Sequence, residues 1–510
     1  MKILYIPLDE RPCNALYPIK AAQVNREVAI ISPEPALLGQ KKTPGNPEAL
    51  QAFVREHFAQ CDCGVFSGEM LLYGGLLPSR LHHFTEADLR GYREFLEELH
   101  ADYPEKKIYL SNLIMRTPRY NSADEEPDYY EVYGERIFRY GWLKDKADRD
   151  GLSATETAEW QVLQGAIPEA VLADYEARRA FNVAVNLLHI ELVAAGVLTF
   201  LSIPQDDSAP YGYTALDQKR VYGAIAARRL KEKIMVYPGA DEVGFTLLAR
   251  AFHEYIGEKP HLFVRYSSTL GPELVPLYED RPMNESLKAH VMAAGFQLVE
   301  SSDQAEFILA YNTPGKIMEE SWEQLTGKDI TYDSYRHLLT FVQDLGKDLA
   351  AGKKVALCDS AFANGGELEL VQLLDETQLL EGLMSYKAWN TNCNSLGSSL
   401  AALAFCRGNY DERKVQENLL HNLFEDLFYQ ALIRMTITRE VLPDLGLTYF
   451  DLQDQSSKIA QLVQEQMLTL AQQELRHSFS EDYAITSLDF PWKRMFEIQC
   501  EIKIGSEQCE

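Results

Sequence analysis

Two pairs of adjacent carboxylates stand out, because each follows a short apolar run and a connection of helix length separates them. Asp206 and Asp207 form the first pair, and Asp241 and Glu242 form the second. Two carboxylates held close together do not ionise equally, so one tends to keep its proton and act as an acid while the other acts as a base or stabilises charge. Cleavage of a glycosidic bond needs this combination. We therefore predict that these four residues are catalytic.

Other polar side chains also follow apolar runs, in clusters rather than singly. A helix cap needs one polar residue, so capping does not account for clusters of two or three. A tryptophan beside several asparagines would suit a sugar, whose ring has an apolar face and a rim of hydroxyl groups, although asparagines also favour turns. Arginines could bind an acidic group of the substrate or hold the acidic residues in place. The predicted substrate-binding residues are Asp9, Arg11, Asn14, Arg80, Arg116, Asp359, Trp389, Asn390, Asn392 and Asn394.

Several other chemistries lack their sequence signals. The chain has no glycine-rich nucleotide loop of either common form, no His-Glu-x-x-His pair and no Gly-x-Ser-x-Gly elbow. Cys61 and Cys63 form a lone C-x-C pair without a second pair nearby, so we expect no zinc site. We expect no cofactor and no bound metal. A hard divalent cation held by the aspartates is the alternative, because all-oxygen sites leave no spacing signature.

The elements that position these residues are strands linked by helices. Apolar β-rich runs alternate with longer helical stretches up to about residue 400, which is typical of a parallel α/β fold. Ligands of such folds bind beyond the carboxyl ends of the strands, so we expect Asp9, Asp206, Asp207, Asp241 and Trp389 around one pocket. The predicted strands are Lys2–Leu8, Val28–Ser32, Gly64–Gly68, Ile108–Leu113, Leu198–Pro204, Ile234–Pro238, His261–Tyr266, Glu306–Tyr311, Lys354–Leu357 and Met384–Ala388.

These strand candidates are too many for a plain eight-stranded barrel. We expect a (β/α)8-like barrel in which 28–32 and 306–311 are accessory strands, and two doubly wound sheets are the alternative. Residues 1–405 would form the α/β catalytic region, with a helical insertion at about 119–196. Residues 406–510 would be mainly helical and end in a strand, because 496–504 alternates apolar and polar residues.

Composition limits the class of protein. The 510 residues include 49 Lys and Arg against 76 Asp and Glu, a net charge of −27 that argues against a nucleic-acid partner. No run approaches the roughly 18 apolar residues that span a membrane. The first apolar run ends at Asp9 and Glu10 without a cleavage site, and the 8 cysteines are scattered. We expect a cytoplasmic protein whose partner is a small molecule.

Several motifs together resemble one family. They are Tyr5-Ile-Pro-Leu-Asp-Glu-Arg-Pro-Cys-Asn14, Gly74-Gly-Leu-Leu-Pro-Ser-Arg80, Pro204-Gln-Asp-Asp207, Pro238-Gly-Ala-Asp-Glu242 and Trp389-Asn-Thr-Asn-Cys-Asn394. In these motifs the chain resembles a bacterial family of roughly 500-residue proteins catalogued as a domain of unknown function. The resemblance runs over most of the chain, and the family label implies no reaction.

A second resemblance is local. Gly239-Ala-Asp-Glu-Val243 is similar to the Gly-Gly-Asp-Glu-Val stretch of β-N-acetylhexosaminidases, which implies that Asp241 orients an acetamido group and Glu242 is the general acid. The second glycine is Ala240 here, and the family's preceding histidine is absent. Asp206 and Asp207 resemble the adjacent aspartates of another substrate-assisted hexosaminidase group. The two resemblances place the acid on different residues.

We therefore expect a carbohydrate-active hydrolase. It would be a glycosidase that acts on a small saccharide, either N-acetylated or without an acetamido group. One alternative is a metal-dependent hydrolase or isomerase that uses the same carboxylates as ligands. The other is a non-catalytic protein that binds a sugar or another metabolite. Loss of an acid would abolish turnover in an enzyme, whereas a binding protein would keep part of its affinity.

Overall fold

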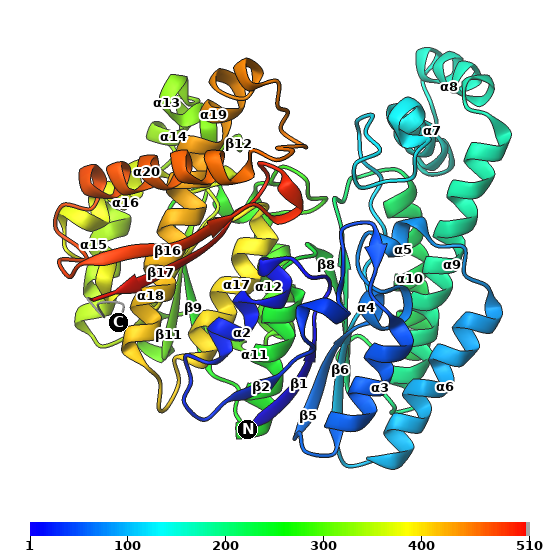
Figure 1. The fold of residues 1–510 in the computed structure, drawn as a ribbon, viewed down its shortest axis with the longest axis horizontal. Helices are drawn as coiled ribbons and strands as arrows, with labels where there is room; N and C mark the ends of the chain where they lie inside the picture. Colours follow the sequence, from blue (N-terminus) through cyan, green and yellow to red (C-terminus); the bar gives the residue numbers. More distant parts are fainter. Residues whose placement is uncertain (506–510) are drawn as a thin grey trace. The chain divides into compact units, whose positions relative to one another are not determined.

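The computed structural model describes residues 1–505, which form two compact units (Figure 1). Unit 1 comprises Met1–Ala15, Ala29–Leu247 and Tyr278–Asp280. Unit 2 comprises Leu16–Val28, Leu248–Leu277 and the chain from Arg281 onward. These units do not coincide with the predicted division between residues 405 and 406.

Unit 1 contains a parallel sheet of six strands in the order β2-β1-β5-β6-β7-β8. Every residue of β5, β7 and β8 is buried, as expected for strands that helices cover on both faces. The chain passes from β1 to one neighbour, β2, and then crosses to the other neighbour, β5, which makes this a doubly wound sheet. The strands are β1 Lys2–Ile6, β2 Ala29–Ile31, β5 Cys63–Ser67, β6 Lys107–Ser111, β7 Phe200–Gln205 and β8 Ile234–Pro238.

Amphipathic helices connect these strands. In α3 the buried residues Leu50, Val54 and Phe58 recur every fourth position, and the side chain of Asn46 caps the helix by accepting from the Ala49 N–H. Three helices, α7 to α9, occupy the chain between β6 and β7. The elements are α1 Pro12–Ala15, β3 Gly39–Gln40, β4 Thr43–Pro44, α3 Pro47–Phe58, α4 Gly68–Tyr73, α5 Pro78–Leu81, α6 Glu86–Asp102, α7 Tyr130–Arg149, α8 Ala154–Ala166, α9 Glu169–Ala194, α10 Tyr213–Arg228 and α11 Val243–Ile256, which ends in unit 2.

Unit 2 contains a parallel sheet of five strands in the order β10-β9-β11-β13-β15. The central strand β11 is fully buried, and its sequence Phe-Ile-Leu-Ala-Tyr-Asn is almost entirely apolar. The chain again fills one side of its first strand, β9, before crossing to the other side, so both sheets wind in the same way. The strands are β9 His261–Tyr266, β10 Gln297–Leu298, β11 Phe307–Asn312, β13 Lys354–Asp359 and β15 Ser385–Lys387.

The rest of unit 2 is mainly helical. Helix α18 continues into a π-helix at Leu423–Ile433, and the antiparallel pair of β16 and β17 follows near the end of the described chain. Alternate residues of β17 are buried, which confirms the predicted half-solvated strand. The elements are α2 Tyr17–Ala22, α12 Met283–Ala293, β12 Glu319–Glu320, α13 Gln324–Gly327, α14 Thr331–Ser334, α15 Leu338–Ala350, β14 Phe362–Ala363, α16 Leu368–Glu376, α17 Asn392–Phe405, α18 Glu412–Asn422, α19 Arg434–Glu440, α20 Ser456–Glu474, β16 Tyr483–Asp489 and β17 Gln499–Ile504.

The α/β class with parallel strands and crossover helices is confirmed. The described strands form two separate larger sheets, which corresponds to the alternative of two doubly wound sheets, and no closed eight-stranded barrel is seen within residues 1–505. The run at 306–311 is therefore not an accessory strand, because β11 lies between β9 and β13 in the centre of its sheet. The run at 28–32 contributes the edge strand β2 of the other sheet.

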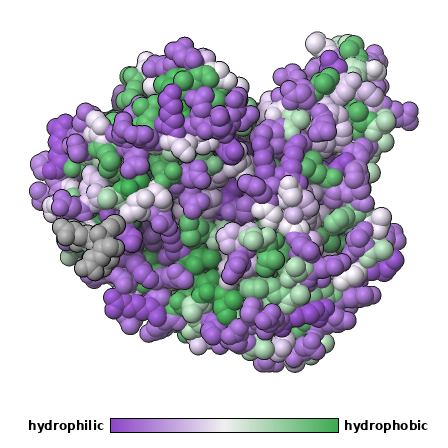
Figure 2. Space-filling view, in the orientation of Figure 1, coloured by the Kyte–Doolittle hydropathy of each residue, from purple (hydrophilic) through white to green (hydrophobic). Residues whose placement is uncertain are grey.

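The surface carries mostly hydrophilic residues. Figure 2 shows them over much of the face in view, with smaller hydrophobic patches among them. In the part of the chain that the structure describes, no helix combines the length and the apolar character needed to cross a membrane.

Candidate active site

Four predicted residues form one cluster at the carboxyl ends of the unit 1 strands. The Arg11 guanidinium lies between two carboxylates, with Nη2 at 2.7 Å from Asp9 Oδ2 and 2.6 Å from Asp241 Oδ1. Asn14 Nδ2 donates to Oδ1 of both aspartates at 2.9 Å. All four side chains are buried. Arg11 therefore holds the acidic residues in place, and it joins the loops after β1 and β8, which are not neighbouring strands.

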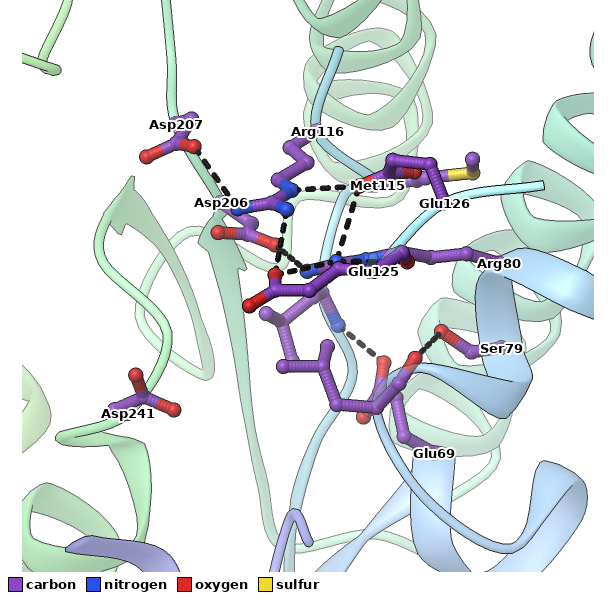
Figure 3. A network of polar contacts seen from close by, with 12 residues as sticks. Glu69, Ser79, Arg80, Met115, Arg116, Glu125, Glu126, Asp206, Asp207 and Asp241 are labelled. Atoms are coloured by element: carbon purple, nitrogen blue, oxygen red, sulfur yellow. Dashed lines mark hydrogen bonds and ion pairs between the residues drawn. The ribbon is translucent and has the colours of Figure 1, made fainter. Parts of the chain in front are cut away.

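A second cluster contains the other two predicted arginines (Figure 3). Arg80 Nη1 lies 3.1 Å from Glu126 Oε1 and 3.3 Å from Glu125 Oε2. Arg116 binds the same two glutamates, with Nε at 2.8 Å from Glu126 Oε1 and Nη2 at 2.6 Å from Glu125 Oε2. These glutamates were missing from the predicted site. The sequence signal was the acidic segment 122–128, which we interpreted only as the start of the helical insertion.

The adjacent aspartates after β7 attach to this cluster in unequal ways. Asp206 Oδ2 lies 2.7 Å from Arg80 Nη2, and its side chain is 13 % exposed. Asp207 has a longer contact, 3.3 Å from Oδ2 to Arg116 Nη1, and is 34 % exposed. The backbone of Asp207 is left-handed, with φ of 44°, an uncommon conformation for a residue other than glycine. The two carboxylates thus differ in pairing and in access to solvent.

Burial and the neighbouring charge of Asp206 raise the pKa of Asp207 to about 6, against the opposing effect of Arg116 and Arg80. The proton of Asp207 is therefore exchanged near neutral pH. Asp241 lies apart from this network in Figure 3 and carries no dashed contact to it. Its bonds go to Arg11 and Asn14 instead.

Glu69 lies in the first turn of α4, directly after β5, and was also missing from the predicted site residues. Its Oε1 accepts from Asn112 Nδ2 and from the Leu113 N–H, both at 2.7 Å. Burial raises the pKa of Glu69 to about 7, although these hydrogen bonds oppose the shift. A cavity of about 10 Å³, roughly the space for one water, is lined by Glu69, Arg80 and Asp206 among others. The position of Glu69 directly after an apolar strand was a usable sequence signal for this site.

Glu242, the acid implied by the hexosaminidase resemblance, is 1 % exposed. Its carboxylate lies against the loop that precedes it, because a Cβ placed on Gly239 would be 2.8 Å from both Oε1 and Oε2. Gly239 also has φ of 125°, which side chains rarely allow. Among the predicted catalytic carboxylates, Asp207 is the one most exposed to solvent.

Asp359 belongs to unit 2, where it ends β13 and is 1 % exposed. It accepts from Asn312 Nδ2 at 2.8 Å, from the Glu367 N–H at 2.7 Å and from Tyr386 Oη at 3.0 Å. Burial and the charge of Glu367 raise the pKa of Asp359 to about 6. These contacts link β13 to β11, to β15 and to the residue before α16. The prediction that Asp359 binds substrate stays a prediction.

Trp389 and the three asparagines also belong to unit 2. The Trp389 ring packs edge-on against Phe496, at 5.9 Å between ring centres. Asn390 has φ of 62°, so it takes the left-handed turn conformation that asparagine favours. Asn392 and Asn394 lie in the first turn of α17, where Asn392 accepts from Tyr311 Oη. The prediction that Trp389 shares a pocket with the unit 1 aspartates stays a prediction.

Metal ligands do not gather in the described part of the chain. Within residues 1–505, no group of three or more His, Cys, Asp or Glu side chains converges as a possible metal site. Cys61 and Cys63 are both buried. The carboxylates of the two clusters are bound by arginines instead.

Comparison with curated proteins finds no match for this chain. A family model matches residues 3–501, which is nearly the whole sequence and includes every predicted site residue. The family is described as a protein of unknown function, in agreement with the resemblance carried by the sequence motifs. The chain therefore belongs to the DUF4127 family.

Proposed function

We propose that unit 1 is a hydrolase domain that cleaves a glycosidic bond in a small saccharide, with N-acetylated saccharides as the first class to test. The observation that carries this proposal is the unequal treatment of two adjacent aspartates: Asp206 is bound at 2.7 Å by Arg80, whereas Asp207 has a 3.3 Å contact and is one third exposed. Adjacent carboxylates in different environments are what an acid and a charge-stabilising partner require.

The roles follow from this difference. Asp207 would donate its proton to the glycosidic oxygen as the bond from that oxygen to the sugar carbon breaks. The carboxylate of Asp206 would stabilise the positive charge that develops on the ring. Addition of water to the ring carbon then returns a proton to Asp207, so that the sum of the steps is hydrolysis. Asp207 replaces Glu242 as the acid in this proposal because Glu242 is buried beneath its own loop.

The surrounding residues support this assignment. Glu125 and Glu126 each contact both Arg80 and Arg116, so the two arginines are fixed from a second side and can hold the aspartates in position. The loop therefore presents Asp207 from a rigid base.

The test is a screen of the full chain with nitrophenyl glycosides, followed by natural disaccharides, with and without a chelator. Asp207→Asn should lower turnover of the natural substrate by about 10²–10⁴ and lower binding far less. A nitrophenolate leaving group needs no protonation, so it should partly rescue this variant and not Asp206→Asn. Asp148→Asn is the matched control, because Asp148 is an exposed aspartate of the same unit outside both clusters.

Three results would overturn the proposal. Full activity in both Asp206→Asn and Asp207→Asn would remove these residues from the reaction. Activity lost with a chelator and restored by magnesium or manganese would favour the metal-dependent alternative. A chain that binds saccharides with unchanged affinity in both variants, and turns none over, would be a binding protein.

A further inference from the structure

Unit 2 contains a large cavity that the proposed reaction does not use. Its volume is about 680 Å³, which is within the usual range of small-molecule sites. Three segments surround it: strand β9 with the loop after it, the segment 333–337, and the first turns of helix α15. Its walls are therefore the ends of several elements rather than one exposed loop.

The position of the cavity is the one that a doubly wound sheet offers to ligands. In the unit 2 sheet, strand β10 lies on one side of β9 and the later strands lie on the other. The winding thus changes direction between β9 and β11. The lining residues 267–269 follow β9, and 333–337 belong to the connection that follows β11. Loops that diverge at such a point leave a crevice beyond the strand ends.

The edge of β9 adds backbone groups to the cavity wall. Strand β10 pairs with β9 only at His261 and Leu262, where the Leu262 carbonyl accepts from the Val299 N–H. The next residues with the same backbone orientation are Val264 and Tyr266, and both line the cavity. No strand of residues 1–505 covers them on that side. Their amide and carbonyl groups can therefore meet a polar ligand.

The charges around the cavity are balanced. Each charged side chain of the lining has a partner of opposite sign, and Lys316, next to the lining, lies over the Tyr335 ring. The lining itself therefore concentrates neither positive nor negative charge. The carboxylate partners of the two arginines are both buried. The pairs are Arg265 with Asp348, Arg336 with Glu367, Asp333 with Lys328 and Asp344 with Lys347.

The uncharged groups of the wall combine aromatic rings with hydrogen-bonding atoms. Phe263 and Tyr335 contribute aromatic rings, over which lie the Arg265 guanidinium at 5.4 Å and the Lys316 ammonium at 4.3 Å from the ring centres. Thr269, Thr340 and other residues offer hydroxyl groups. The Thr340 N–H donates to His337 Nδ1 at 3.3 Å, so the proton of this ring lies on Nε2, which can donate. A sugar ring presents an apolar face and a rim of hydroxyls to such a wall.

We propose that this cavity is a second binding site, separate from the proposed catalytic residues, and that it takes an uncharged sugar ring. The ring could belong to a free monosaccharide or to the ribose of a nucleoside, since both present the same hydroxyl-bearing ring. The proposal does not rest on the hydrolase function of unit 1.

The test measures binding to the full chain by saturation-transfer NMR and calorimetry, with D-glucose, N-acetyl-D-glucosamine, D-ribose, adenosine and uridine, and with glucose 6-phosphate as the charged comparison. Thr269→Trp places a large ring at the exposed rim and should weaken binding at least tenfold. Thr326→Trp is the matched control, because Thr326 is an exposed threonine of unit 2 outside the lining. Thermal melting should show both variants folded.

Comparison of the compounds shows which class of sugar the cavity binds. Binding of the hexoses alone assigns a monosaccharide, and binding of ribose and both nucleosides assigns a nucleoside. Thr269→Trp should leave the glycoside turnover of unit 1 unchanged while it weakens binding here, which separates this site from the proposed catalytic one. The proposal is overturned if no neutral compound binds, if Thr269→Trp and Thr326→Trp bind equally, or if glucose 6-phosphate binds more tightly than glucose.

Discussion

Arg11 Nη2 lies 2.6 Å from Asp241 Oδ1, although 230 residues separate the two in sequence. The same nitrogen lies 2.7 Å from Asp9 Oδ2, so one guanidinium pairs with two buried carboxylates from different loops. Removal of one partner of a buried ion pair leaves the other charge buried and uncompensated. The free energy of folding lost in this way exceeds the net free energy that the intact pair contributes. The buried ion pairs of this cluster therefore tie the loop after β1 to the loop after β8.

Replacement of this arginine should destabilise unit 1. Arg11→Met leaves Asp9 and Asp241 buried without their cation, and we expect the free energy of unfolding to fall by about 3–5 kcal/mol in urea titrations. The control is Arg90→Met, because Arg90 is 66 % exposed and lies 3.8 Å from Glu86. That change should cost less than about 1 kcal/mol. Equal stability of the two variants would show that the ion pairs of Arg11 do not stabilise unit 1.

The loop that carries Asp241 and Glu242 should require glycine at position 239. Gly239→Ala adds a Cβ that would lie 2.8 Å from both Glu242 oxygens, on a backbone with φ of 125°. We expect a loss of about 1–3 kcal/mol. Gly223→Ala is the control, since Gly223 lies in α10 and a Cβ there meets nothing within 4 Å. That substitution should be neutral or stabilise the helix by up to about 1 kcal/mol. If Gly239→Ala left the free energy of unfolding unchanged, the loop could adjust to the added methyl group.

The stability of unit 1 should depend on the protonation of Glu69. Its folded pKa of about 7 lies above the ordinary value of 4.5, so its favourable contribution is complete below pH 4.5 and is lost as pH rises through 7. Glu69→Gln removes this dependence. The stability of the variant minus that of the unmodified chain should therefore rise between pH 5 and pH 8, by on the order of 1–3 kcal/mol. Urea unfolding at four pH values measures the difference in stability. A difference that stays constant with pH would show that Glu69 is not the group that makes stability depend on pH.

The proposed hydrolysis should lose rate as Asp207 loses its proton. Because the pKa of Asp207 is raised to about 6, turnover should fall on the alkaline side of pH 6. Asp207→Asn should abolish this alkaline limb together with most of the activity on natural substrates. Glu242→Gln should keep the limb, since Glu242 is buried under Gly239. A limb that disappears only in Glu242→Gln would return the acid role to Glu242, as the first hexosaminidase resemblance implies.

Several features of this protein follow from the sequence alone. Parallel strands covered by helices are buried on both faces, so they occur as short apolar runs, and the runs beginning at residues 2, 108, 234, 261 and 354 match strands of the two sheets. Strand β17 was recognisable from its alternation because only one of its faces is buried. The polar residues after these runs could also be predicted, since strand ends are where parallel sheets place ligands and caps.

The tertiary structure alone decided which sheet each strand joins and which charges meet. Strand order depends on how the connections cross, and local periodicity does not encode it; the run at 306–311 therefore looked accessory, although β11 is central to its sheet. Likewise Glu125 and Glu126 lie in a loop far in sequence from Arg80, and only folding brings these charges within 3.3 Å. Side-chain partners are set by the packing of distant elements. Residue types therefore indicated a candidate site, and only the geometry showed that Asp207 is the least buried of its predicted catalytic carboxylates.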